Sequence, residues 1–257
     1  LCASGDDRGC RLVRDSQGPD GRFWRSPRRN PDNLGEPKSF SRDQANGVML
    51  YLVSTRDREA AINWLNWIEN NRPFLIINPL GGCMVRGPHR FCSDEANQMC
   101  TLTPASWAVL ARVFTFLDLP LSREMNLFKG MDLDILVAEA RHAPLGYETH
   151  LPAVEVFLKQ LIQVVPDKTQ EAAEALNERQ PENPFFDYLA NSSSPDLEAK
   201  LLQVCPDSSE QRDFPRRQWA WERDTAEAAW LESMGWDCLF MANLLSRSKQ
   251  ISRQFDL

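Results

Sequence analysis

The sequence contains no uninterrupted apolar run approaching the roughly 20 residues that a membrane-spanning helix requires. It has no Cys-x-x-Cys pair and only three histidines, which argues against a zinc site. A Gly-x-Ser-x-Gly nucleophile elbow, a phosphate-binding loop and a dinucleotide fingerprint are all missing. We therefore expect no membrane span, no metal and no cofactor, so that any catalysis would come from side chains.

A positive overall charge is also lacking, since the formal net charge is −7 and the isoelectric point is about 5.1. A nucleic-acid partner is not expected, because nucleic-acid-binding domains are usually basic. The exception is local, as the first 30 residues are rich in arginine. A basic segment on an acidic body suits a saccharide or another small anionic ligand, although a solvated arm would have the same composition.

Seven cysteines are many for a chain of this size, and their placement is informative. Cys2 and Cys10 flank a short Gly/Asp-rich loop, and three more cysteines lie in the polar, Gly-rich stretch 83–100. Such positions favour disulfides that staple loops, which form in oxidising compartments. We expect Cys2 to pair with Cys10 and the protein to be secreted or periplasmic. Because seven is odd, at least one thiol is free if the others pair, and Cys205 or Cys238, both near apolar sequence, is the candidate for an ordinary buried thiol.

Helical signals dominate after residue 40. Ser41 and Gln44 form a capping box before an apolar stripe, Asp57 caps a second helix, and Thr103-Pro104 is a strong start for a third. There is no βαβ alternation and no convincing β-hairpin signal. The sequence therefore predicts an all-α fold in a single domain, 1–257, with an ordered loop segment at 1–40 and a helical body at 41–257. Further helices are expected at 132–141, 148–164, 168–179, 184–190, 195–203 and 223–246.

Carboxylates beside arginines are candidate acid/base groups. Asp43 is the first, because it lies in the opening turn of a helix next to Arg42, although a carboxylate there also complements the helix dipole. Asp20 is its candidate partner, since glycosidic hydrolysis uses two carboxyl groups, but Gly-Pro-Asp-Gly is an ordinary turn sequence as well. Glu222 and Asp224 are the alternatives to this pair.

Guanidinium and aromatic groups near these acids are candidate binding groups. Arginines of the segment 22–29 fit carboxylates, phosphates or sulfates, while its aromatic rings could stack on a sugar or fasten the loop to the core. Tyr147 and His150 lie within one helical turn and could act as base and acid in β-elimination of a uronate, or could simply pack. The candidate substrate-binding residues are Arg22, Trp24, Arg25, Arg42, Tyr147, His150, Trp219, Trp221 and Arg223.

Helices that come in pairs, joined by loops that carry these residues, resemble the α/α-toroid carbohydrate-active enzymes, namely glycoside hydrolases and polysaccharide lyases. The similar segments are Asp20-Gly21-Arg22-Phe23-Trp24-Arg25, Phe40-Ser41-Arg42-Asp43-Gln44 and Trp219-Ala220-Trp221-Glu222-Arg223. The resemblance implies helical hairpins in a complete or partial ring, with a saccharide cleft at one end. It also implies that 219–223 packs beside 20–44, because a ring closes by bringing its last hairpin against its first.

These observations together predict a secreted or periplasmic enzyme that hydrolyses a polysaccharide or oligosaccharide, including an anionic one, with Asp43 as acid/base. A non-enzymatic helical module that binds a glycan or a protein would use the same Arg/Trp surface. A polysaccharide lyase is a third reading, and it requires Tyr147, His150 and an arginine to converge.

Overall fold

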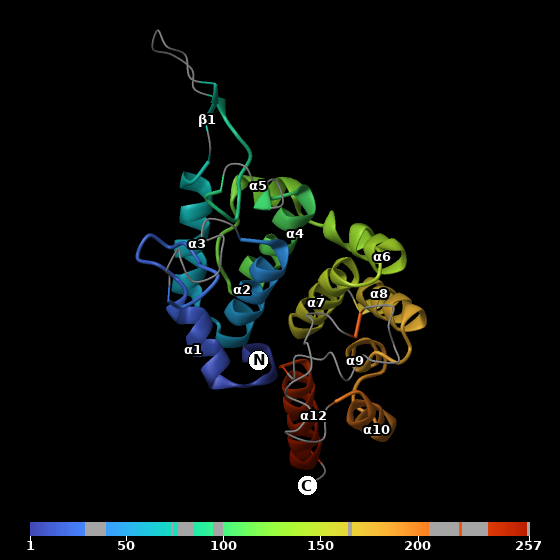
Figure 1. Ribbon diagram of the computed structural model, residues 1–257. Coiled ribbons are helices and arrows are strands. Elements are labelled where there is room, and N and C mark those ends of the chain that lie inside the picture. Colours follow the sequence, from blue (N-terminus) through green and yellow to red (C-terminus); the bar gives the residue numbers. More distant parts are fainter. Residues whose placement is uncertain are drawn as a thin grey trace. The chain divides into compact units, whose positions relative to one another are not determined.

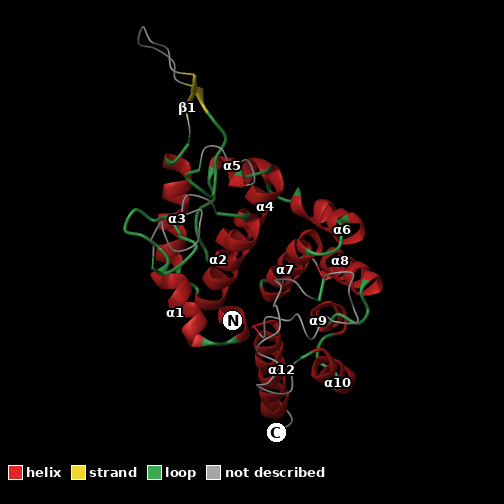
Figure 2. Ribbon diagram, viewed as in Figure 1, coloured by secondary structure: helices red, strands yellow, loops and turns green. Residues whose placement is uncertain are grey.

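The computed structural model describes residues 1–28, 40–72, 74–76, 85–94, 100–163, 166–205, 221–222 and 236–255 (Figure 1). These residues are mostly helical, and the strands among them are one short antiparallel pair (Figure 2). The chain divides into two compact units. Arg8–Asp132 is called the N-terminal unit below, and Leu133–Leu257 together with Leu1–Asp7 is called the C-terminal unit.

The N-terminal unit contains the helices that carry the first candidate residues. Helix α2 packs against α3 and α4, and α4 packs against α5. The elements are α1 (Asp7–Asp15), which begins at the unit boundary, α2 (Arg42–Thr55), α3 (Arg58–Asn70), β1 (Phe74–Ile76), β2 (Val85–Arg86), α4 (Pro104–Phe116) and α5 (Arg123–Phe128).

Side-chain caps define where these helices start. The Asp57 carboxylate accepts a hydrogen bond from the N–H of Ala60 at 3.0 Å, so α3 begins at Arg58, with two residues between it and the end of α2. The Thr103 hydroxyl accepts from the N–H of Ser106 at 3.2 Å, and Pro104 follows it at the first helical position. The short turn makes α2 and α3 a helical hairpin.

Aromatic rings fill the core of the N-terminal unit. Trp64 is 1% exposed, and its ring stacks on Phe91 with centroids 5.6 Å apart. Phe23 meets Trp64 edge-on at 5.6 Å and Tyr51 at 6.4 Å. Burial of each such ring contributes roughly 1.5–3 kcal/mol, so the segment before α2 is held on the α2–α3 hairpin by its own aromatic residue.

The C-terminal unit is a second set of packed helices. Helix α8 packs against α7 and α9, and α12 packs against η1 and α10. Phe157 of α7 makes edge-on contacts with Phe185 of α9 at 6.0 Å and Phe240 of α12 at 5.5 Å. The elements are η1 (Cys2–Ser4), α6 (Asp132–His142), which begins at the unit boundary, α7 (Tyr147–Leu161), α8 (Pro166–Arg179), α9 (Pro184–Asn191), α10 (Pro195–Val204) and α12 (Trp236–Phe255).

The all-α class is confirmed for the described residues, and several helix starts lie where the sequence places them. One correction concerns the segment 1–40, which is predicted to be loop although Asp7–Asp15 is helical. No residue of this helix is buried, and Cys10, Leu12 and Val13 are its only apolar side chains, too few to mark a helix by a repeating pattern. Of the helix expected at 223–246, the part before residue 236 lies outside the described residues. The single-domain assignment stays a prediction.

The disulfides bear on the cysteine assignments. Cys92 is bonded to Cys100, and Cys205 is bonded to Cys238, which corrects the expectation that Cys205 or Cys238 is a free buried thiol. The last two are 33 residues apart in sequence, so the composition of their neighbourhoods could not reveal the pairing. Cys2 and Cys10 are also disulfide-bonded, as their predicted pairing requires. Cys83 lies outside the described residues.

Peptide mapping checks these bonds. Digestion of the alkylated protein without reductant is expected to release the Cys205 and Cys238 peptides as one linked species that reductant separates. The same result is expected for Cys92 with Cys100 and for Cys2 with Cys10. Recovery of alkylated Cys238 from unreduced protein would contradict the assignment.

Candidate functional site

The segment before α2 is fastened to α3 by polar contacts. The Gln17 side-chain amide donates to the carbonyl oxygens of Gly21 at 3.0 Å and Ala60 at 2.9 Å. Gly21 has a φ of +90°, and a Cβ at this position would lie 2.3 Å from the carbonyl oxygen of Asn63. Only glycine fits such a turn against a helix, and the contact fixes the backbone of the neighbouring Arg22.

Arg22 lies against two indole rings. Its guanidinium carbon is 4.1 Å from the ring centroid of Trp24 and 5.8 Å from that of Trp67, which are cation–π distances. Burial lowers the pKa of the Arg22 guanidinium, and the charge of Asp20 acts in the opposite direction. The predicted binding residues Arg22 and Trp24 therefore lie together, with Trp67 as a member that the sequence does not single out.

The other polar residues of this segment have simpler surroundings. Asp20 accepts a hydrogen bond from the N–H of Arg22 at 3.1 Å, and this contact favours the turn role over the catalytic one. Arg25 and Arg28 are exposed and Arg42 is half-buried, and all three make further interactions. Arg29 lies outside the described residues.

Asp43 lies in the first turn of α2, where the N–H of Ser41 donates to Gln44 Oε1 at 3.1 Å and closes the predicted capping box. Its Oδ1 atom is buried and makes no hydrogen bond within the described part of the chain. Three residues on, Asn46 is 1% exposed, and its Nδ2 atom has no partner there either. An acceptor and a donor therefore stay open on neighbouring positions of one helix face.

In the C-terminal unit, His150 of α7 contacts Glu222. The distance between His150 Nδ1 and Glu222 Oε1 is 2.8 Å, and the Glu222 side chain is only 5% exposed against 22% for His150. The side-chain amide of Gln180, the residue directly after α8, donates to the backbone oxygen of Glu222 at 3.0 Å and helps to hold it in place. Two residues that the sequence singles out, 72 positions apart, thus form one pair.

Asp237, in the first turn of α12, is the third member of this cluster. The pKa of Asp237 is raised from 3.8 to about 6, mainly by burial and then by the charge of Glu222, whereas His150 and the amino group of Leu1 act to lower it. A carboxyl group with a raised pKa beside a second carboxylate and a histidine is typical of acid–base sites. The sequence does not single out Asp237, and only its burial and its electrostatic neighbours distinguish it from an ordinary acid at a helix start.

Residues next to Glu222 in the chain or bonded to its backbone carry open hydrogen-bonding atoms. The indole N–H of Trp221 is buried and makes no hydrogen bond among the described residues, and the same holds for Gln180 Oε1. Asn177, three residues before Gln180 on α8, also has an open oxygen. A ligand that both donates and accepts hydrogen bonds would satisfy these atoms.

The remaining candidates are only partly placed. Tyr147 starts α7, three residues before His150, and is half-buried with a further interaction of its own. Trp219, Arg223 and Asp224 lie outside the described residues. The expected approach of 219–223 to 20–44 links residues of two different units, and it stays a prediction.

Asp237, Gln180 and Asn46 are the residues that sequence reasoning missed. Asn46 carried a usable signal, because it is a polar residue directly beside the apolar stripe of α2. Asp237 resembled an ordinary helix-start acid, and Gln180 an ordinary helix-end amide. Their roles depend on which other elements approach them.

Among the described residues, no group of three or more histidine, cysteine, aspartate or glutamate side chains is arranged to hold a metal ion. No helix in the described ranges has both the length and the hydrophobicity needed to cross a membrane. The chain matches no known protein family, no curated protein and no solved structure. A function for this protein is therefore inferred from the geometry of its own residues.

Proposed function

We propose that this protein is a secreted or periplasmic enzyme that hydrolyses glycosidic bonds of a polysaccharide or oligosaccharide through acid–base catalysis in its C-terminal unit. The observation that carries the proposal is the 2.8 Å contact between His150 and the buried Glu222, in a cluster that includes Asp237. Most glycosidases use two carboxyl groups, of which one donates a proton and the other is ionised.

The two carboxyl groups take different roles because their surroundings differ. Asp237, with its pKa raised to about 6, holds a proton in part of the population near neutral pH and gives it to the leaving glycosidic oxygen as the C–O bond breaks. Glu222 takes a proton from the attacking water, or attacks the anomeric carbon itself before water releases the sugar. His150 is a positioning residue that orients the Glu222 carboxylate.

The substrate class follows from the open atoms of Trp221 and Gln180. The Trp221 indole N–H is a donor and Gln180 Oε1 is an acceptor, and a sugar hydroxyl can satisfy either kind of group. The disulfides support an oxidising compartment. Packed helices with polar residues in the connections are compatible with a partial or complete α/α toroid, which remains part of the proposal.

Asp43 is given no proton-transfer role in this proposal. The carboxyl group paired with it in the sequence analysis, Asp20, is engaged in its own turn. The open atom on the same face of α2 belongs to the Asn46 amide, which does not exchange a proton as a catalytic acid or base does. The surroundings of Asp43 therefore fit a role in ligand binding better than a role in catalysis.

The test is an assay of hydrolysis on a panel of neutral and acidic polysaccharides, in which the reducing ends that are released are measured. Glu222→Gln keeps the shape of the side chain and removes its charge, so kcat is expected to fall by about 10²-fold or more with saccharide affinity retained. Glu178→Gln, an exposed acid on α8, is the matched control and should keep wild-type kcat.

Three outcomes separate the alternatives. Full activity of a normally folded Glu222→Gln variant would remove the cluster from catalysis. If the wild-type protein binds glycans but cleaves none of them, the protein is a non-enzymatic binding module. Products that carry a new C=C bond would identify a lyase. The residues that support this alternative are Tyr147 and His150, which lie within one turn of α7.

A further inference from the structure

A second set of open hydrogen-bonding atoms lies in the N-terminal unit, at the end of the α2–α3 hairpin away from its turn. Asp43 Oδ1 and Asn46 Nδ2 are both buried, and within the described ranges neither atom has a hydrogen-bond partner. Asn46 is 1% exposed, whereas Asp43 keeps part of its side chain at the surface. A buried amide donor without a partner costs about 1–3 kcal/mol, so a ligand group that reaches and bonds this atom is favoured.

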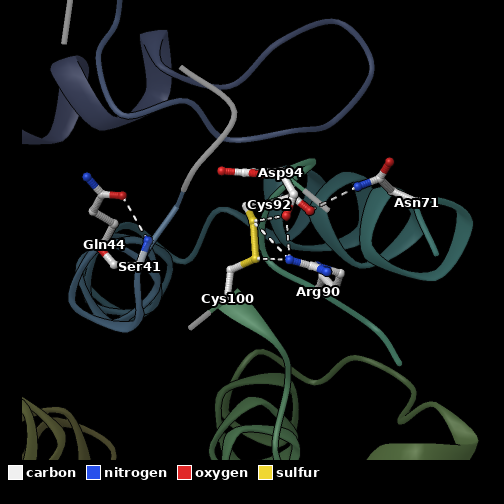
Figure 3. The surroundings of a disulfide bond; sticks show 7 residues. All are labelled: Ser41, Gln44, Asn71, Arg90, Cys92, Asp94 and Cys100. Atoms are coloured by element: carbon white, nitrogen blue, oxygen red, sulfur yellow. Dashed lines mark hydrogen bonds between the residues drawn. A yellow bond between two sulfur atoms is a disulfide. The ribbon is translucent and has the colours of Figure 1, made fainter. Parts of the chain in front are cut away.

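The surroundings of this hairpin end are well built. Figure 3 shows Ser41 and Gln44 of α2 on one side of the Cys92–Cys100 disulfide, and Asn71 at the end of α3 on the other. The Asn71 side-chain amide donates to the Cys92 carbonyl at 3.3 Å. Arg90 is buried, and it donates to the Asp94 carbonyl and contacts Cys100 Sγ at 3.2 Å. Cys92 and Cys100 are thus tied to the end of α3 and to the buried Arg90.

An aromatic group lies at the same level of the hairpin. Because the chain turns over Arg56 and Asp57, positions equally far from that turn lie level with one another, which places Trp67 of α3 level with Asn46 of α2. Trp67 is part of the stack in which the Arg22 guanidinium contacts two indole rings. Arg22 and Trp67 are buried in this stack, whereas Trp24 keeps part of its surface exposed, and an exposed indole face can stack on a sugar ring.

We propose that Asp43 and Asn46 form a saccharide-binding site in the N-terminal unit, in which one sugar hydroxyl donates to Asp43 Oδ1 and accepts from Asn46 Nδ2. A hydroxyl group suits this place because it donates one hydrogen bond and accepts others, as the two open atoms demand. A carboxylate or phosphate could satisfy only the amide, and an ammonium only the carboxylate. The choice of saccharides as ligands rests on the proposed function, but the site contains no residue of the catalytic cluster.

The experiment measures the chemical shift of the Asn46 side-chain amide in a ¹⁵N–¹H NMR spectrum of the ¹⁵N-labelled full chain. Loss of one amide pair in Asn46→Ser assigns the signal, and the exposed Asn66 of α3 is the internal control. The probes are glucose, galactose, mannose and glucuronate with their β-linked disaccharides. A saturable shift of the Asn46 signal with at least one probe, and none of the Asn66 signal, is expected.

Three variants make the result specific. Asp43→Ala and the milder Asp43→Asn are expected to weaken probe binding by about tenfold, since a hydrogen bond to a charged group is lost. Glu59→Ala, an exposed acid on α3, should bind as the wild type does. Glu222→Gln should also retain the probe-induced shift of the Asn46 signal, so the test of this site is independent of the test of the proposed catalysis.

Two outcomes would overturn the proposal. An Asn46 signal that no probe moves would mean that an ordered water, and no sugar, fills the place. A shift that persists unchanged in folded Asp43→Ala would mean that the sugar binds elsewhere.

Discussion

Asp237→Asn is expected to stabilise the fold at pH 7 and to abolish turnover at the same time. The pKa of Asp237 is raised from 3.8 to about 6, so between these pH values the folded protein holds a proton that the unfolded chain releases. The stability of the wild type therefore falls as pH rises from about 4 to 6, and the loss is complete above pH 6. One pKa unit corresponds to about 1.4 kcal/mol, which gives a penalty of up to about 3 kcal/mol at pH 7.

Asparagine is neutral at every pH and nearly isosteric, so the variant avoids this penalty. Urea unfolding at pH 3.5 and pH 7 is expected to show little difference between variant and wild type at the lower pH and the full difference at the higher one. Turnover is expected to fall by about 10²–10⁴-fold, because asparagine cannot donate the catalytic proton.

The control is Asp196→Asn, an exposed acid in the first turn of α10, which should change stability by no more than a few tenths of a kcal/mol at either pH. Equal stability of Asp237→Asn and wild type across this pH range would show that the Asp237 carboxyl is well solvated. Retained turnover would exclude Asp237 as the proton donor.

Arg112→Met is expected to destabilise the N-terminal unit by about 3 kcal/mol. Arg112 Nε lies 2.6 Å and Nη2 lies 3.0 Å from the two oxygens of Asp132, whose side chain is fully buried. Removal of one partner leaves a buried carboxylate without its counter-charge, which usually costs 3–5 kcal/mol. We expect the lower end of that range, because Asp132 makes further interactions.

The structure supplies a matched comparison. Arg141 pairs with Glu171 at a similar distance, 2.8 Å, but the two side chains are 52% and 34% exposed. Arg141→Met should therefore cost less than about 1 kcal/mol. Urea unfolding of both variants measures the difference, and an additional Asp132→Leu change should recover part of the loss in Arg112→Met, because it removes the stranded charge. Similar costs for the two arginine variants would contradict the role of burial.

Local sequence determined most of the helical structure of this protein. The helix starts at Ser41, Asp57, Thr103, Asn183 and Ser194 could be predicted because each cap residue bonds within three positions of itself. The same holds for the turn role of Asp20, which depends on a hydrogen bond two residues along the chain. Helix α1 escaped prediction because it is short and has few apolar side chains, none of which is buried.

Only the tertiary structure decided which of the candidate residues meet. His150 and Glu222 each appeared among the candidates, but their contact spans 72 positions, and the bond between Cys205 and Cys238 spans 33. The raised pKa of Asp237 likewise depends on its burial and on the charge of Glu222. Whether Asp43 Oδ1 and Asn46 Nδ2 have hydrogen-bond partners depends on which side chains pack against α2. Desolvation and charge proximity are properties of packed elements, so a pattern along the chain specifies the helices but not the site that they assemble.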